Sequence, residues 1–443
     1  MHENPRKTTA DILYSTLVKS SSASSEIDAV RRKNIYSDAD MRFVSEVVFG
    51  CLRKLEYIDY AISYASNIKL NKISPFVLCV MRTGAYQILF MDRVPDSAAV
   101  NESVKIIRRC ANPRASGFAN AVLRKVAANG TNIPLPEDKS ELLSIEYSCP
   151  RWIVDSWQSH FGEQTQQILS AMNKKPPTFL RANSLRTDSA RLCEMLRADG
   201  WECSVYHSDI FPQAADLLQV TRIGKPISEV KAYRDGLFYI QDAAAAYAAY
   251  VLAPKAGMHV IDMCAAPGGK STHMAELMKN SGKITAFDIY PEKLGRINDN
   301  AQRLGIGIID TVLADSTVYN DSYRSSADCV LADVPCSGLG IIRRKPDIKY
   351  TRKKDDITAL ANIGYKVLCN AAMYLKPGGR MVFSTCTTER AENEDNLFRF
   401  LDAHPEFKLK KINCGRENDG YITLLPNRDG CDGFFISVVE RDK

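Results

Sequence analysis

Short apolar runs alternate with helical stretches over the C-terminal half of the chain, and this alternation restricts the fold more than any other feature. The runs lie at residues 258–263, 283–288, 309–314, 328–333 and 379–384. Apolar strands separated by helices are typical of βαβ units, whose strands form a parallel sheet covered by helices. The sequence therefore predicts a Rossmann-like α/β domain over residues 241–443. Residues 421–425 and 434–439 are expected to close it as an antiparallel pair.

The first of these strands runs into a glycine-rich turn followed by a helix. The turn consists of Cys264, Ala265, Ala266, Pro267, Gly268, Gly269 and Lys270. Glycine allows a close backbone approach that a Cβ atom would block, and a helix N-terminus favours a carboxylate. The turn lacks the GxGxxG spacing of dinucleotide sites and the first glycine of a P-loop. A tight connection without a ligand remains the alternative for the turn taken alone.

Polar or reactive residues stand at the ends of the following strands, namely Asp288, Asp315, Asp333 and Cys386. The carboxyl ends of parallel strands meet at one edge of the sheet, where open α/β sheets bind ligands. Asp288 lies where a carboxylate can accept hydrogen bonds from both ribose hydroxyls. Because no pyrophosphate fingerprint is present, an adenosyl cofactor with a methionine carboxylate fits best. We therefore expect S-adenosyl-L-methionine as the cofactor.

Two cysteines near the same edge indicate which atom is methylated. C5 of a pyrimidine is a poor nucleophile, but a thiolate that adds to C6 turns C5 into a nucleophilic carbon, and a base must then remove the C5 proton. Cys336 and Cys386 both suit the thiolate role, and Asp333 suits an acid near N3 of cytosine. Cys329 and Cys369, with apolar neighbours, are assigned to packing.

The excess positive charge lies entirely in the first third of the chain. Residues 1–140 hold 20 Lys+Arg against 14 Asp+Glu, and the rest holds 38 of each. The pattern there is helical, with one long helix expected from Phe43 to Ile58 and another over 75–90. A basic helical domain suggests a polyanionic partner, most simply nucleic acid, although a solvated face is the alternative. Residues 141–240 read as a small α+β module.

The number of cysteines and the residues at the start of the chain indicate the cellular compartment. Thirteen cysteines without an apolar secretory signal or a membrane-length apolar run favour a cytoplasmic protein with free thiols. No pair has the CxxC spacing, so we expect no metal site.

Together, the motifs resemble the Sun (Fmu) family of RNA cytosine-C5 methyltransferases. The resemblance rests on residues 264–270, Asp333-Val334-Pro335-Cys336, Thr385-Cys386 and Asp432-Gly433-Phe434-Phe435. The first third resembles the NusB-like RNA-binding domain of the bacterial 16S rRNA member. The resemblance implies a class I methyltransferase fold with cofactor contacts from Cys264 through Lys270, Asp288, Asp315 and Asp333.

The chemistry alone does not decide which of the two cysteines attacks C6, and the same resemblance implies a role for each. A Pro-Cys cysteine is the nucleophile of DNA cytosine methyltransferases, which favours Cys336. In the Sun family the Thr-Cys cysteine attacks C6, which favours Cys386, and the Pro-Cys cysteine assists release. This sequence departs from the family at Val334, where Ala is usual, and at Ala244, where Ser often follows the Gln-Asp pair.

A basic stretch, 341–354, follows Cys336 and is expected to contact RNA phosphates, with Tyr350 available to stack on a base. The whole sequence thus predicts a monomeric RNA (cytosine-C5) methyltransferase of 16S rRNA, without DNA or membrane partners. The alternatives are a methyltransferase acting on tRNA or large-subunit rRNA, one acting on an exocyclic amine, and a non-catalytic RNA-binding assembly or antitermination factor with an inert methyltransferase fold.

Overall fold

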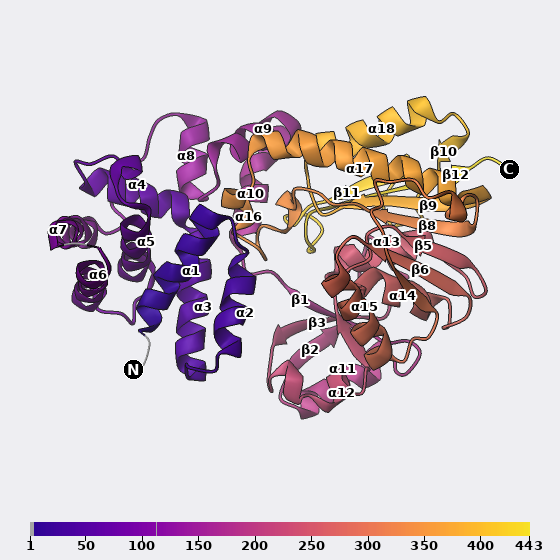
Figure 1. Cartoon of the computed structure of the whole chain (residues 1–443), viewed down its shortest axis with the longest axis horizontal. Helices are drawn as coiled ribbons and strands as arrows, with labels where there is room; N and C mark the ends of the chain where they lie inside the picture. The colour runs from indigo at the N-terminus through magenta and orange to yellow at the C-terminus, as the bar shows by residue number, and fades with distance from the viewer. Residues whose placement is uncertain (1–3, 112) are drawn as a thin grey trace. The chain divides into compact units, whose positions relative to one another are not determined.

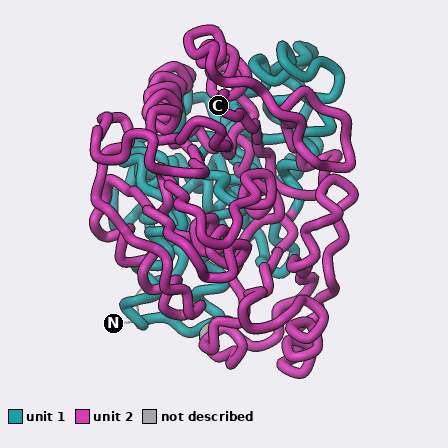
Figure 2. The backbone as a smooth tube through the Cα atoms, turned by 90° about the vertical axis from the view of Figure 1, so that its right-hand side faces the viewer, with its two compact units in different colours: residues 1–174, 342–353 teal, residues 175–341, 354–443 magenta. Residues whose placement is uncertain are grey.

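The computed structural model describes residues 4–111 and 113–443, and these fold into two compact units. The first unit holds residues 1–174 and 342–353, and the second holds 175–341 and 354–443, shown in teal and magenta (Figure 2). None of the described helices combines the length and apolar character needed to cross a membrane.

The first unit is built from helices, as predicted. In the described part of the chain these are α1 (Pro5–Lys19), α2 (Ala23–Arg32), α3 (Asp38–Arg53), α4 (Leu55–Ala65), α5 (Pro75–Phe90), α6 (Asp96–Cys110), α7 (Pro113–Asn129), α8 (Lys139–Glu146), α9 (Arg151–Phe161) and α10 (Thr165–Asn173). Helix α5 has the predicted bounds, with Pro75 at its first turn and buried apolar side chains on most sides. The prediction of a single helix from Phe43 to Ile58 is wrong, because α3 ends at Arg53 and α4 begins at Leu55, with Lys54 between them.

Residues 342–353 of the basic stretch after Cys336 belong to the first unit, and the predicted RNA contact needs correction at two of them, Lys349 and Tyr350. It contains the short helix α16 (Ile348–Thr351). The Lys349 ammonium is buried, donates to the Ser148 carbonyl, and has its pKa lowered to about 8 by burial. Tyr350 donates to the same carbonyl at 3.2 Å and packs against the core of the first unit. Burial removes Lys349 from RNA phosphates, and Tyr350 is held by its hydrogen bond and its core contacts. Lys345, Lys353 and Lys354 of the same stretch stay exposed.

Within the second unit, residues 178–240 form a small module, defined here as the small-sheet module. Its antiparallel sheet has the order β2 (Glu202–Val205), β3 (Leu217–Arg222), β1 (Thr178–Ala182) and β4 (Phe238–Ile240). Helices α11 (Ser189–Ala198) and α12 (Lys231–Arg234) accompany the sheet (Figure 1). The predicted mixture of strand and helix is confirmed.

The large sheet of the second unit confirms the predicted Rossmann-like domain (Figure 1). Its order is β10 (Phe407–Leu409), β12 (Phe434–Arg441), β9 (Leu375–Thr385), β8 (Ala327–Asp333), β5 (His259–Asp262), β6 (Lys283–Asp288) and β7 (Ile309–Leu313), and β11 (Tyr421–Leu424) pairs with β12. Strands β5 to β9 are parallel, while β10, β11 and β12 pair antiparallel.

Helices cover both faces of this sheet because successive strand residues point to opposite sides. Val260 packs into a core with α13 (Ala243–Leu252) and α14 (Gly269–Leu277), whereas its neighbour Ile261 packs into a core with α17 (Lys354–Tyr374) and α18 (Glu394–Ala403). Helix α15 (Pro291–Leu304) contributes to the first of these cores. With both faces covered, the carboxyl edge of the sheet is left for a site.

Candidate active site

The glycine-rich turn joins the end of β5 to α14, as predicted. The Ala266–Pro267 peptide bond is cis, and Gly268 has φ +97°, in the left-handed region that a side chain rarely adopts. A Cβ atom on Gly268 would also lie 3.2 Å from the Ile297 backbone. The turn therefore depends on glycine at this position.

A cavity of about 230 Å³ opens against this turn. It is lined by Tyr239, Ile240, Gln241, Asp242, Ala245, Asp262, Cys264, Ala265, Ala266, Pro267, Gly269, Lys270 and Asp333. Six of the seven predicted turn residues are present, and Gly268 shapes the turn without lining the cavity. The Gln241 Nε2 atom is buried here and has no hydrogen-bond partner among the described residues, so the cavity offers an unused donor to a ligand.

These features fit S-adenosylmethionine, whose carboxylate and ribose need donors and acceptors beside a close backbone. The cavity residues that would hold the cofactor are those of the turn together with Gln241 and Asp333. Asp262 at the end of β5 accepts from Ser271 Oγ at 2.6 Å, and burial raises the pKa of Asp262 to about 6.

Asp288 and Asp315 are at the predicted edge of the sheet but outside the lining of this cavity. Asp288 ends β6, is buried, and accepts from the Tyr290 backbone N–H at 3.1 Å. Asp315 follows β7, is exposed, and accepts from the N–H and hydroxyl of Thr317. The structure therefore brings Asp333 to the cavity and leaves Asp288 and Asp315 outside its lining.

Asp333 is the last residue of β8, and its carboxylate makes one charged and one polar contact. Lys270 Nζ lies 2.6 Å from one carboxylate oxygen of Asp333, and Ser384 Oγ donates to the other at 2.8 Å. Burial opposes the charge of Lys270, but Asp333 and the other anionic groups near it outweigh this and raise the pKa of Lys270. The cavity thus contains an ion pair at the end nearest the cysteines.

The two predicted cysteines meet at this end of the sheet. Their Sγ atoms are 3.1 Å apart, and the Cys386 backbone N–H donates to Cys336 Sγ at 3.3 Å. The neighbouring Cys386 thiol and burial raise the pKa of Cys336 well above its usual value, and Glu392 and Asp333 add to the effect. In the described part of the chain, no group of three or more His, Cys, Asp or Glu side chains is placed to hold a metal ion.

The loops that carry the cysteines are fixed by a pair of residues that the sequence analysis missed. Glu392 accepts from the Ser337 N–H at 2.7 Å and from Ser337 Oγ at 2.6 Å, beside Cys336. The next residue, Asn393, accepts from Thr385 Oγ1 and donates to the Thr387 carbonyl on either side of Cys386. Only the nearness of these residues to the Thr-Cys motif in sequence could have drawn attention to them.

Glu392 gives a testable pH dependence of stability. Burial raises its pKa to about 7 from a usual value of 4.5, so between these values the folded chain keeps a proton that the unfolded chain releases. Stability therefore falls as the pH rises through this window. We expect wild-type protein to lose on the order of 1–3 kcal/mol relative to Glu392→Gln between pH 5 and pH 8, measured by thermal unfolding. Parallel curves for the two proteins would contradict this, and the exposed Glu163→Gln serves as the control.

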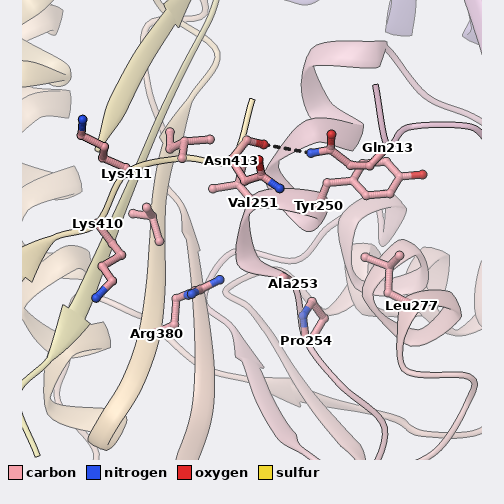
Figure 3. A pocket seen from close by; sticks show the side chains of 12 residues that line it. Gln213, Tyr250, Val251, Ala253, Pro254, Leu277, Arg380, Lys410, Lys411 and Asn413 are labelled. Carbon is pink, nitrogen blue, oxygen red and sulfur yellow. Dashed lines mark hydrogen bonds between the residues drawn. The ribbon is translucent and has the colours of Figure 1, made fainter. Parts of the chain in front are cut away.

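A second cavity, about 450 Å³, lies away from the predicted site residues and includes Arg380 of β9 in its lining (Figure 3). Arg380, Lys410 and Lys411 stand on one wall, and Tyr250 and Leu277 on the other. Both Arg380 and Lys410 pair with Glu440. Among the described residues that line this cavity there is no cysteine, histidine or carboxylate, so we place the chemistry at the cavity of the glycine-rich turn.

Comparisons with known proteins agree with this site. Residues 249–440 match the family described as 16S rRNA methyltransferase RsmB/F, residues 3–128 match the NusB family, and residues 149–223 match the RsmF/B-like ferredoxin-like domain. The chain is 35% identical over 94% of both lengths to the probable ribosomal RNA small subunit methyltransferase B of Bacillus subtilis. It is 31% identical over 98% of both to the methyltransferase B of Salmonella paratyphi A.

Solved structures show the same architecture. The crystal structure of PH0851 matches over the full length of both chains, with a TM-score of 0.84 and 26% identity. A methyltransferase homologue from Pyrococcus horikoshii matches 69% of this chain and 100% of its own, with a TM-score of 0.61 and 28% identity. The expected resemblance, fold and cofactor are thereby confirmed. The chain belongs to the RsmB/F family of S-adenosylmethionine-dependent RNA methyltransferases.

Proposed function

We propose that this protein methylates C5 of a cytidine in 16S rRNA through a covalent bond between Cys386 and C6 of the base. The observation that carries this proposal is the pair of cysteines, 3.1 Å apart, beside a cavity built from the glycine-rich turn. The relatives named as ribosomal RNA small subunit methyltransferases support the choice of RNA. An inert fold or an exocyclic-amine enzyme has no use for two adjacent thiols at this edge.

The chemistry needs a nucleophile that adds and leaves. The Cys386 thiolate gives an electron pair to C6, and the displaced pair makes C5 nucleophilic. C5 takes the electrophilic methyl group that the bound cofactor would supply, and the electron pair of the broken S–CH3 bond stays on the cofactor sulfur. Loss of the C5 proton to a base restores the C5–C6 double bond and returns the C6–S electron pair to Cys386.

The surroundings of the two sulfurs support assigning the attack to Cys386. The Cys386 thiol and burial raise the pKa of Cys336, and Glu392 and Asp333 add to this, whereas Cys386 lies close enough to the Lys270 ammonium for their charges to interact. A nearby cation favours a thiolate, and nearby anions disfavour one. Cys336 then assists release, because its Sγ can hydrogen-bond the sulfur that leaves C6.

Asp333 acts on the base in this proposal. Bond formation at C6 places negative charge on the ring, and the Lys270 ammonium, which donates to Asp333 at 2.6 Å, would stabilise that charge near N3. Asp315 and Asp288 remain proposed cofactor contacts, together with Cys264, Ala265, Ala266, Pro267, Gly268, Gly269 and Lys270.

Exposed cations on two packed helices of the first unit support a surface for RNA. Arg108 and Arg109 end α6, and Arg114, Arg124 and Lys125 stand on α7, all exposed. Phosphates of a polyanion are the ligands that such a surface attracts. We propose that the protein acts as a cytoplasmic monomer. The expected boundary at residue 140 differs from the end of the first compact unit, which continues to residue 174.

The cofactor assignment of Asp288 gives a second prediction. Asp288→Ala should weaken S-adenosylmethionine binding by ~2–3 kcal/mol, because the variant has no charged acceptor for the ribose hydroxyls. Isothermal titration calorimetry measures this. Asp310→Ala, on the exposed side of the neighbouring strand β7, is the control and should bind normally. Unchanged affinity in a folded Asp288→Ala protein would remove Asp288 from the site.

The reaction itself can be tested with the full chain. Incubation with a 16S rRNA transcript and S-adenosylmethionine should produce 5-methylcytidine in digested RNA, detected by mass spectrometry. Methylation of another base, or none in 16S rRNA and assembling subunits alike, would contradict the proposed function.

A further inference from the structure

A buried arginine of the small-sheet module contacts the cofactor turn directly. Arg181 on β1 is 0% exposed and pairs with Glu276 of α14 at 2.8 Å. The same guanidinium donates to the Gly269 carbonyl at 2.8 Å and to Thr272 Oγ1 at 3.1 Å. A further N–H donates to Gln241 Oε1. One side chain therefore ties the module to the first turn of α14, where the cofactor cavity begins.

The module also supplies a wall of that cavity. Tyr239 and Ile240 at the end of β4 line it, together with Gln241 directly after the module. The Arg181 guanidinium lies over the Tyr239 ring, with 5.4 Å between its Cζ atom and the ring centroid. A Cβ atom added to Gly269 would lie 2.9 Å from this ring. The Tyr239 ring therefore packs directly against the glycine of the turn.

The contact with Arg181 fixes which way the Gln241 amide points. A guanidinium has donors and no acceptors, so it must face the amide oxygen. The Nε2 group is then directed elsewhere. It is buried without a partner among the described residues, on a side chain that lines the cavity. An acceptor atom of a ligand, such as a carboxylate or hydroxyl oxygen, would satisfy it.

We propose that Arg181 is a positioning residue for S-adenosylmethionine, which acts by holding the Gly269 carbonyl and by turning Gln241 Nε2 toward an acceptor oxygen of the cofactor. The small-sheet module is then part of the cofactor site, in addition to any contact with RNA. This inference rests on the cofactor of the family and is independent of which RNA base is methylated.

The test must separate positioning from folding. Removal of Arg181 alone would leave Glu276 charged in a buried site and is expected to destabilise the protein. The test variant is therefore Arg181→Met with Glu276→Leu, which removes both charges and keeps side-chain volume. The matched control is Arg82→Met with Asp59→Leu, which removes a bidentate ion pair of the first unit, with N–O distances of 2.7 and 2.6 Å.

Calorimetry with S-adenosylmethionine on the full-length proteins gives the readout. The Arg181/Glu276 variant should bind about tenfold more weakly, and the Arg82/Asp59 variant should bind as wild type. Gln241→Leu should also reduce the affinity for S-adenosylmethionine about tenfold. The variant that combines this change with the Arg181/Glu276 change should lose much less than a hundredfold in affinity, because Arg181 acts through Gln241.

Arg181→Lys keeps the charge but not the planar fork, so it should rescue folding and only part of the affinity. Wild-type affinity in the folded Arg181/Glu276 variant would overturn the proposal. Full additivity with Gln241→Leu, or an equal loss in the Arg82/Asp59 control, would also overturn it. Failure of wild-type protein to bind the cofactor would instead count against the proposed function.

Discussion

A covalent RNA adduct should accumulate with Cys336→Ala and should be absent with Cys386→Ala. If Cys386 attacks C6, its loss removes the bond to RNA and abolishes methyl transfer. If Cys336 assists release, its loss leaves the methylated cytosine attached to Cys386 after one turnover, because the thiolate leaves only after the C5 proton is removed. The expected effect is complete loss of activity in one variant and at most one methyl group per enzyme in the other.

A denaturing gel of each variant with substrate RNA and S-adenosylmethionine shows the adduct as a shifted band. Cys414→Ala, a partly exposed cysteine outside the site, serves as the control and should turn over normally without a band. A shifted band with Cys386→Ala alone would make Cys336 the nucleophile. Normal turnover in both variants without a band would exclude covalent catalysis.

Charge reversal on α6 should weaken RNA binding and leave cofactor binding unchanged. Arg108 and Arg109 are exposed at the end of this helix. Each phosphate that the protein no longer neutralises reduces the slope of log affinity against log salt by about 0.9 for duplex and about 0.7 for single-stranded nucleic acid. We expect Arg108→Glu with Arg109→Glu to bind RNA at least about tenfold more weakly at low salt, with a slope smaller by about 1–2 units.

Lys279→Glu with Lys283→Glu, two exposed cations in the second unit, is the matched control for this change. A drop in affinity that does not depend on salt, or an equal drop in the control, would argue against the α6 surface. Point changes are preferable to truncation here. Residues 141–174 and 342–353 share a unit with residues 1–140, so cutting at 140 would expose side chains that pack against its core, Tyr350 among them.

The large sheet could be predicted because its signals are local and repeated. Each parallel strand is a short apolar run that ends in a polar residue, and covering both faces requires apolar residues on both, as at Val260 and Ile261. Strand ends then meet at one edge, so Asp333, Cys336 and Cys386 converge without any further information. The tight Gly268 turn follows from glycine at that position.

Other features depend on distant partners that a pattern does not specify. Nothing marks Lys54 as the end of α3, because neither glycine nor proline stands there. The sequence around Lys349 is typical of a surface cation. Its burial depends on the carbonyl of Ser148, which is far away in sequence. Arg181 and Glu392 are ordinary charged residues in sequence, and their roles arise only from the groups that burial places around them.

Bisulfite sequencing of 16S rRNA from cells with and without this gene tests the central claim most directly. A 5-methylated cytidine resists conversion, so the account predicts one position that reads as cytidine when the gene is present and as uridine when it is deleted. Complementation with wild-type protein should restore the cytidine reading, and complementation with Cys386→Ala should not. Identical conversion at every 16S cytidine in the two strains would contradict the account.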